Sequence, residues 1–293
     1  AKDSDFPKKW MFGMACMLKK GLHLHQIHQI DRPFAEMMLG LESWIPMYMT
    51  GQISPYYLKE STGQPFMHLL KVSGAAALQG EAIYGHHTQG RYYLTKHKTE
   101  ISYYKEMAEL LLKKASPLME IFRENSMMPY HAFLQADAKT SGKRYHILSA
   151  LPLQTLNSSL LEDILNQNQI NKEDAQKIKT YIDKKSTQIQ QILSHDMITE
   201  EFPILSKEEF SRFPIALPLS DIFYEKNIYY TWEMYKQHLE STLNYEKTHQ
   251  NYCIKQNQQS AFRNIQIRIH EKNGFLYLKT EPLQFIFSSG ILK

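Results

Sequence analysis

The sequence has only two cysteines, Cys16 and Cys253, among its 293 residues. They lie far apart and neither belongs to a Cys-x-x-Cys pair, which argues against a secreted disulfide framework. A reduced, cytoplasmic setting is therefore expected. Because Cys16 lies in the apolar run 14–18, we expect its thiol to be buried as a small hydrophobic group.

Long hydrophobic runs are also missing. No stretch approaches the roughly 20 apolar residues that a membrane span needs, and the longest candidate, 34–49, is broken by Glu36, Glu42 and Pro46. The first residues lack the basic, apolar and small segments of a signal peptide. We therefore expect a soluble protein without membrane contact. Since the sequence begins with Ala1 rather than Met, we also expect a piece of a longer chain.

Neither sign of charge dominates. The 34 Lys and Arg residues face 30 Asp and Glu residues, which gives a formal net charge of +4. The two signs alternate along the chain, which indicates a solvated surface rather than a dedicated nucleic-acid-binding face. Hydrophobic residues make up 43% of the chain, so there is ample material for a core. The length suggests one large or two modest domains.

Common catalytic motifs are absent. The chain contains no Gly-x-Ser-x-Gly elbow, no phosphate-binding loop, no Gly-x-Gly-x-x-Gly and no His-Glu-x-x-His. The triplet 270–272 has the His-x-Lys form of the phospholipase D motif, but Tyr277 stands where that motif needs Asp. The following Asn273-Gly274 is typical of a hairpin turn. We therefore expect no enzyme, no catalytic residue and no cofactor.

Two histidines form the best candidate for a metal site. His23 and His25 share one face of a strand predicted over 22–28, and they could ligate Zn²⁺ if a third ligand came from elsewhere. The alternative is a strand whose polar face carries histidines while Leu22, Leu24 and Ile27 supply the core. We favour this alternative and assign no metal.

The order of elements favours an α/β fold. We expect a mixed, mostly parallel sheet flanked by helices, with two similar halves, because strand pairs recur in 66–122 and 262–287. The segment 157–195 is rich in Asn, Gln, Lys and Glu and indicates two helices, while the three prolines of 201–220 indicate an irregular connection. The predicted parts are an α/β half over 1–156, a helical hairpin or connector over 157–200, and a second α/β half over 201–293.

A ligand pocket is predicted from residue types alone. Aromatic and methionine side chains gather in 37–57, and such side chains line adaptable pockets. Arginines in apolar surroundings offer forked donors to an anion. The candidate ligand-binding residues are Trp44, Tyr48, Tyr57, His68, Arg91 and Arg263.

Residues 31–57, with 11–21 and 262–267, carry a resemblance to a known group of proteins. The sequence resembles the long C-terminal part of uncharacterised bacterial helix-turn-helix regulators. The resemblance implies a sensor region behind a phage-repressor-type DNA-binding head that this chain lacks. DNA would then be contacted only through that head, the effector would be a small molecule or a protein, and a second copy of the chain is an expected partner. The order of helix, Gly21 and strand is also similar to phospholipase-D-like sensor domains with a degenerate catalytic motif.

These observations make a ligand- or signal-sensing domain of a transcription regulator the first hypothesis. A ligand acts in such a domain only by favouring one conformation over another. Two alternatives stay open. One is a hydrolase that acts on a phosphoester or uses a metal held by the histidine cluster, and the other is a protein-interaction module that docks through 157–195.

Overall fold

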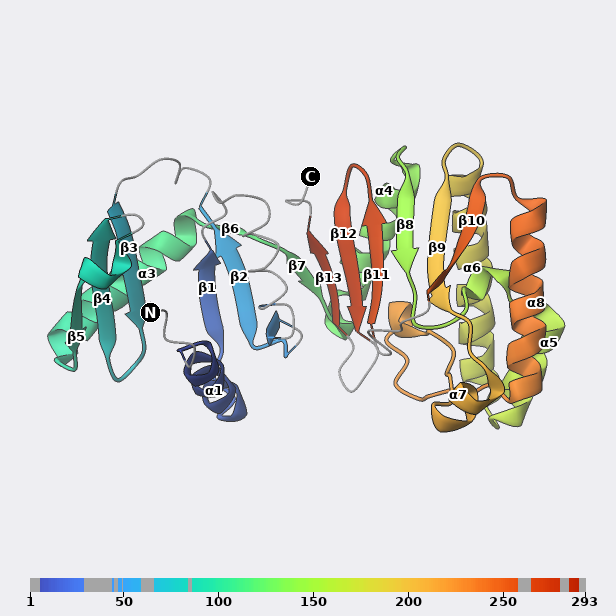
Figure 1. The fold of residues 1–293 in the computed structure, drawn as a ribbon, viewed down its shortest axis with the longest axis horizontal. Coiled ribbons are helices and arrows are strands. Elements are labelled where there is room, and N and C mark those ends of the chain that lie inside the picture. The colour runs from blue at the N-terminus through green and yellow to red at the C-terminus, as the bar shows by residue number, and fades with distance from the viewer. Residues whose placement is uncertain are drawn as a thin grey trace. The chain divides into compact units, whose positions relative to one another are not determined.

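The computed structural model describes residues 6–28, 44, 47–48, 50–58, 66–83, 86–257, 265–279 and 285–289. The chain is an α/β protein that forms two compact units, Ala1–Leu118 (unit 1) and Met119–Lys293 (unit 2), drawn in Figure 1. The sequence-based division at 156 therefore falls inside unit 2. Among the described residues, no helix combines the length and apolar character that crossing a membrane requires.

Unit 1 contains a small sheet with the order β1–β2–β6. Strand β1 (Leu24–His28) runs parallel to β2 (Ile53–Tyr57), and β6 (Ser116–Pro117) is antiparallel to β2. Helix α1 (Phe6–Lys19) precedes β1. Cys16 on α1 is exposed, contrary to expectation, because α1 buries Met14 and leaves most of its described side chains at the surface.

The second sheet of unit 1 is an antiparallel meander. It consists of β3 (Phe66–Val72), β4 (Ala77–Ile83) and β5 (Arg91–Thr95), with the short helix η1 (His87–Gln89) before β5. Helix α3 (Lys98–Lys114) packs against β3 and β4. Gly80 is required in β4, because a Cβ there would lie 2.5 Å from the ring of Tyr92.

Unit 2 is built on one seven-stranded sheet with the order β10–β9–β8–β11–β12–β13–β7. Strands β8, β9 and β10 are mutually parallel, and every other pair in this sheet is antiparallel. The strands are β7 (Glu120–Phe122), β8 (Arg144–Ile147), β9 (Ile198–Pro203), β10 (Tyr252–Asn257), β11 (Ile265–His270), β12 (Gly274–Lys279) and β13 (Phe285–Ser289).

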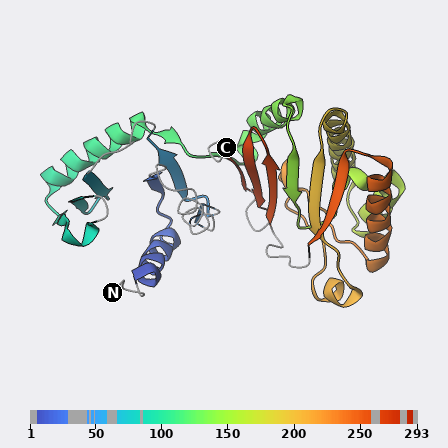
Figure 2. The ribbon, with the colours of Figure 1, turned by 45° about the horizontal axis from the view of Figure 1, so that its top comes forward.

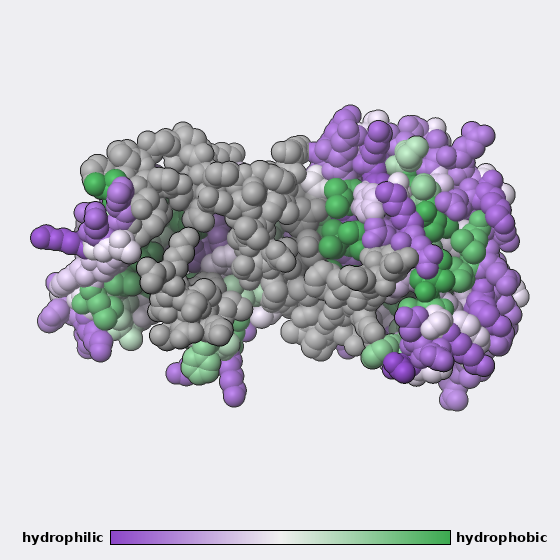
Figure 3. All heavy atoms as spheres, in the orientation of Figure 1, coloured by the Kyte–Doolittle hydropathy of each residue, from purple (hydrophilic) through white to green (hydrophobic). Residues whose placement is uncertain are grey.

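Helices cover one face of this sheet. Helices α4 and α6 pack against each other on that face, and α8 packs beside β10 (Figures 1 and 2). The helices are α4 (Met127–Lys139), α5 (Ser158–Gln167), α6 (Lys172–Leu193), α7 (Lys207–Arg212) and α8 (Trp232–Thr248), with the short helices η2 (Glu124–Ser126), η3 (Leu153–Thr155) and η4 (Ser220–Ile222). On the opposite face, hydrophobic residues are visible between hydrophilic ones (Figure 3), and Ile269 of β11 is 41% exposed.

The two helices predicted within 157–195 exist as α5 and α6. They are not a separate connector. The buried side chains of α5 and α6, including Ile164 and Ile178, belong to the main apolar core of unit 2. The two helices therefore form the crossover from β8 to the parallel strand β9.

Two expectations about the sheets need correction. Antiparallel pairs outnumber parallel pairs among the described strands, so the sheets are mixed rather than mostly parallel. The cause is hairpin chemistry, since short turns such as Asn273-Gly274 can join only antiparallel strands. The units are also not two similar halves, because the described strands form two three-stranded sheets in unit 1 and one seven-stranded sheet in unit 2.

Candidate functional site

A row of polar side chains crosses the centre of the sheet in unit 2, on the face that α4 and α6 cover. Glu200 of β9 lies beside His146 of β8, and Arg268 of β11 lies opposite His146. Directly opposite residues on neighbouring strands bring their Cβ atoms within about 5 Å of each other. The row stands where the parallel half of the sheet meets the antiparallel half.

Glu200 anchors one end of the row. It is 2% exposed, and its carboxylate accepts hydrogen bonds from His146 Nδ1 (3.0 Å), Gln154 Nε2 (2.9 Å) and the Tyr252 hydroxyl (2.5 Å). Burial raises the pKa of Glu200, but the hydrogen bonds from His146 and Tyr252 outweigh it and lower the pKa below its ordinary value. Glu200 is therefore ionised at neutral pH.

His146 is held in one tautomer by this carboxylate. A carboxylate can only accept, so Nδ1 carries the hydrogen and Nε2 presents a lone pair. Burial lowers the pKa of His146, and the hydrogen bond to Glu200 opposes that shift only in part. The imidazole is thus neutral at pH 7 and oriented by a charged partner.

A second carboxylate, Asp221 of η4, lies over the other end of the row. Its Oδ1 accepts from the Tyr130 hydroxyl of α4 (2.5 Å), and its Oδ2 accepts from Arg268 Nη2 (2.8 Å), Lys185 Nζ of α6 (3.1 Å) and the Tyr181 hydroxyl of α6. We call these five residues the Asp221 cluster. Burial raises the pKa of Asp221, but Arg268 and Lys185 hold it far below its usual range.

The two cations of the cluster are only partly enclosed. The side chains of Lys185 and Arg268 are 14% and 15% exposed. Burial and the neighbouring Arg268 lower the pKa of Lys185. Burial also acts to lower the pKa of Arg268, but Asp221 reverses this and raises it. Within the described part of the chain, Nε and Nη1 of Arg268 have no hydrogen-bond acceptor, and neither atom is fully buried.

The position of the cluster in the fold is typical of a ligand site. Asp221 belongs to the segment between β9 and α8, which also holds α7, and Figure 1 shows α7 at the end of the sheet where β8 and β9 finish. Ligands of open α/β sheets bind beyond the carboxyl ends of the parallel strands. Next to Asp221, the hydroxyl oxygen of Ser220 is buried and makes no hydrogen bond with the described residues.

Chemically, the cluster can bind an anion. Two cations share one carboxylate oxygen, so their nitrogens lie close together. Arg268 keeps Nε and Nη1 for a further acceptor, and Lys185, which also donates to the Tyr181 hydroxyl at 3.3 Å, keeps one N–H. It is less suited to acid–base catalysis on its own. Asp221 is held ionised, and burial raises the pKa values of Tyr130 and Tyr181 well above the ordinary value.

The predicted pocket residues Trp44, Tyr48 and Tyr57 lie in unit 1 beside β1. The Trp44 and Tyr48 rings stack with centroids 5.9 Å apart, and the Tyr48 hydroxyl is 2.6 Å from His28 Nε2. Tyr57 of β2 pairs in register with His28. Burial raises the pKa of Tyr48, which is 1% exposed. Trp44 and Tyr48 therefore lie against His28, a histidine that the pocket prediction omitted, and Tyr57 lies beside it on the neighbouring strand.

The other predicted pocket residues lie elsewhere. His68 of β3 and Arg91 of β5 flank Glu81 of β4, each opposite it in register. At the surface, His68 Nδ1 lies 3.8 Å from the carboxylate of Glu81. Arg263 lies outside the described residues. The structure thus places His68 and Arg91 on the β3–β4–β5 sheet, apart from the sheet that carries Tyr57.

The structure describes both the candidate metal site at His23 and His25 and the triplet 270–272. His23 Nε2 lies 2.8 Å from the Ser54 hydroxyl, and the His23 and His25 rings are 4.9 Å apart. No group of three or more metal-ligating side chains occurs among the residues that the structure describes. The triplet 270–272 ends β11 and leads into the turn before β12, so the hairpin prediction is confirmed.

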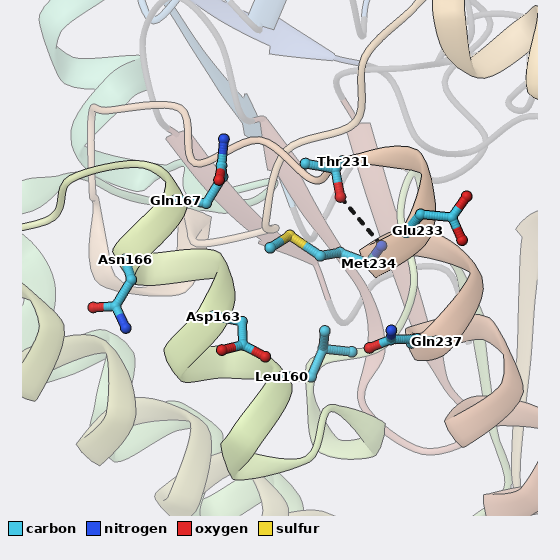
Figure 4. A pocket seen from close by; sticks show the side chains of 8 residues that line it. All are labelled: Leu160, Asp163, Asn166, Gln167, Thr231, Glu233, Met234 and Gln237. Atoms are coloured by element: carbon cyan, nitrogen blue, oxygen red, sulfur yellow. Dashed lines mark hydrogen bonds between the residues drawn. The ribbon is translucent and has the colours of Figure 1, made fainter.

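An open groove of about 520 Å³ lies between α5 and α8 (Figure 4). Its lining includes the apolar Leu160 and Met234 and the acidic Asp163 of α5 and Glu233 of α8. Glu233 is already paired with Lys236 at 2.6 Å. The groove has no buried charge, so the Asp221 cluster remains the stronger candidate.

No known family model matches this sequence, and no curated protein or solved structure matches it significantly.

The sequence analysis did not identify any residue of the Asp221 cluster or of the polar row formed by Glu200, His146 and Arg268. One local signal existed. In β9, Ile198, Glu200 and Phe202 are buried on the same face, so an acidic residue interrupts an apolar alternation. Such a residue must be paired. For Asp221, in a proline-rich segment predicted to be irregular, the sequence contains no comparable signal.

Proposed function

We propose that this protein is a ligand-sensing regulatory protein of the cytoplasm, and that unit 2 recognises a compact anion at Arg268 and Lys185. The observation that carries the proposal is the geometry of these two cations. Both donate to the same oxygen of Asp221, and the side chains of Lys185 and Arg268 remain 14% and 15% exposed. A phosphate or carboxylate group of a small metabolite matches such paired donors.

The charge balance of the site supports a compact ligand of low charge. Asp221 and Glu200 balance Arg268 and Lys185 as long as His146 is neutral. An added anion leaves an uncompensated negative charge in this poorly solvated site. Protonation of His146 returns the net charge of the site to zero, so we expect anion binding to be coupled to proton uptake at this imidazole.

The proposed regulatory role is supported by the number of helices and strands that meet at the ligand site. The Asp221 cluster connects α4, α6, η4 and β11 through side-chain contacts to one carboxylate. An anion bound by the remaining N–H groups of Arg268 and Lys185 weakens their interactions with Asp221, and so weakens the contacts that join these elements. The resemblance of the sequence to bacterial regulators supports a transcriptional output, delivered through a DNA-binding head attached to this chain.

The test is a ligand titration of the full chain followed by thermal unfolding. Inorganic phosphate and small dicarboxylates serve as probes. A ligand that binds only the native state stabilises it by about 2.7 kcal/mol at a hundredfold excess over its Kd. We expect a saturable rise in Tm with one of these anions. The absence of a saturable rise with every anion tested would contradict the proposal.

A matched pair of α6 variants tests the site itself. Lys185→Met keeps the aliphatic stem and removes the charge beside Asp221, whereas Lys179→Met removes an exposed lysine that pairs with Glu162. We expect the first variant to weaken anion binding by roughly tenfold or more, which is the loss of one charge-assisted hydrogen bond. The second should bind like the wild type. Equal affinities for both variants would place the anion elsewhere.

A hydrolase remains the second candidate, favoured by the His146–Glu200 pair. A neutral imidazole oriented by a carboxylate can accept a proton from water, and Arg268 beside it could stabilise developing negative charge. Turnover of simple phosphoesters by the full chain, lost on His146→Asn, would support this reading. Saturable anion binding without turnover would support the sensor.

A further inference from the structure

Helix α3 has two apolar faces, although its sheet occupies only one of them. The inner face carries Ile101, Tyr104, Ala108 and Leu112, which are buried or half-buried. The Tyr104 hydroxyl donates to Gln79 of β4 at 2.5 Å, which fixes this face against the β3–β4–β5 sheet. Figure 2 shows α3 lying along one face of that sheet.

The outer face carries a second stripe of large hydrophobic residues. Tyr103 is 59% exposed, Met107 39%, Leu110 59% and Leu111 36%. The first three follow a spacing of four and then three residues, which places them on one line along the helix. This is the spacing with which one helix packs against another in a coiled-coil seam. A soluble monomer rarely leaves such a contiguous stripe uncovered.

The charges beside the stripe are arranged for one particular partner. Glu106 and Lys113, both exposed, flank the same side of the stripe one heptad apart. When two copies of α3 pack antiparallel with the two-fold axis between Met107 and Leu110, Glu106 of each copy faces Lys113 of the other. A symmetric interface requires this self-complementarity. A parallel pair would not bring these two flanking positions together.

We propose that two copies of this chain associate through antiparallel packing of α3 along the stripe of Tyr103, Met107, Leu110 and Leu111. In this pairing Met107 of one copy contacts Leu110 of its partner, and the reciprocal contact repeats across the axis. The inference concerns unit 1 and does not depend on anion binding in unit 2.

The first test measures the association of the full chain by sedimentation equilibrium over a wide concentration range. We expect a monomer–dimer equilibrium for the wild type. Met107→Glu should abolish the dimer by burying a charge at the seam. Ser102→Glu adds the same charge at an exposed position on another side of α3 and should dimerise like the wild type. A wild type that stays monomeric, or a Met107→Glu variant that still dimerises, would overturn the proposal.

The second test identifies the antiparallel geometry. Glu106→Lys alone and Lys113→Glu alone each place like charges face to face, and each should weaken dimerisation by roughly tenfold. The double variant restores opposite charges and should recover wild-type affinity. Circular dichroism confirms that all variants keep their helices. A double variant as weak as the single ones would exclude this packing of α3.

Discussion

We expect the buried histidine of α8 to make the stability of unit 2 depend on pH. His238 is 0% exposed. Its Nε2 lies 3.2 Å from the Pro152 carbonyl, which can only accept, so Nε2 carries the hydrogen. Its Nδ1 then accepts from the Tyr230 hydroxyl at 2.8 Å. Both ring nitrogens are thus satisfied in the neutral form, and burial lowers the pKa of His238 to about 4.

The sign and size of the effect follow from this lowered pKa. In the unfolded chain His238 titrates near its ordinary value of 6.5. As the pH falls below 6.5, the unfolded state takes up a proton that the folded state refuses, so folding loses free energy until the pH reaches about 4. One pKa unit corresponds to about 1.4 kcal/mol. Proton linkage therefore predicts that the free energy of unfolding falls by about 2 kcal/mol between pH 7 and pH 5, and by about 3 kcal/mol by pH 4.

The assay compares the wild type with His238→Gln, which keeps a donor near Pro152 and does not titrate. Urea unfolding is followed by the fluorescence of Trp232, which packs against the same core, after Trp10 and Trp44 are replaced by Phe. At pH 7 the variant should be less stable by about 1–3 kcal/mol, because Tyr230 loses its acceptor.

The decisive quantity is the difference in the free energy of unfolding between wild type and variant, and how this difference changes with pH. We expect this difference to shrink by about 2 kcal/mol from pH 7 to pH 5. Burial also lowers the pKa values of His146 and His270, but both are present in both proteins, so their contributions cancel. A difference that is the same at both pH values would refute the assigned protonation of His238.

Three further outcomes are expected. Arg144, 3% exposed, donates to three carbonyls in and after the end of α4, so Arg144→Met should cost about 3–5 kcal/mol in urea unfolding. Gly142→Ala should cost about 1–3 kcal/mol, because φ is 155° and a Cβ would lie 2.9 Å from His270 Nε2, whereas Gly13→Ala meets nothing within 4 Å and should not destabilise. Anion affinity, measured by calorimetry in buffers of different ionisation enthalpy, should rise as the pH falls, with proton uptake at His146.

Elements that depend on local chemistry could be predicted from the sequence. Helix α6 begins after Asn171, whose side chain accepts from the Asp174 N–H, and the apolar spacing that follows sets its length. The β11–β12 hairpin follows from Asn273-Gly274, with Gly274 at a φ of 87°. These signals lie within a few residues of the element that they determine.

Strand order and the candidate site could not be predicted in this way. Strand β9 carries Glu200 in its centre and ends at Pro203, so its sequence does not read as a core strand. Its place between β8 and β10 depends on pairings 50 residues away or more. Asp221 meets Tyr130 across 91 residues and Arg268 across 47. Such contacts exist only once the sheet and its helices have assembled.

The buried charges of unit 2 are better explained by orientation than by stability. Replacing a buried ion pair by apolar residues of similar size is often neutral or stabilising, and Tyr130 and Tyr181 of the cluster already pack in apolar clusters of unit 2. What an apolar replacement could not provide is a pair of fixed N–H donors. Asp221 holds Arg268 and Lys185 in place before any ligand arrives, which reduces the entropy that binding must overcome. This preorganisation is the property that anion recognition requires.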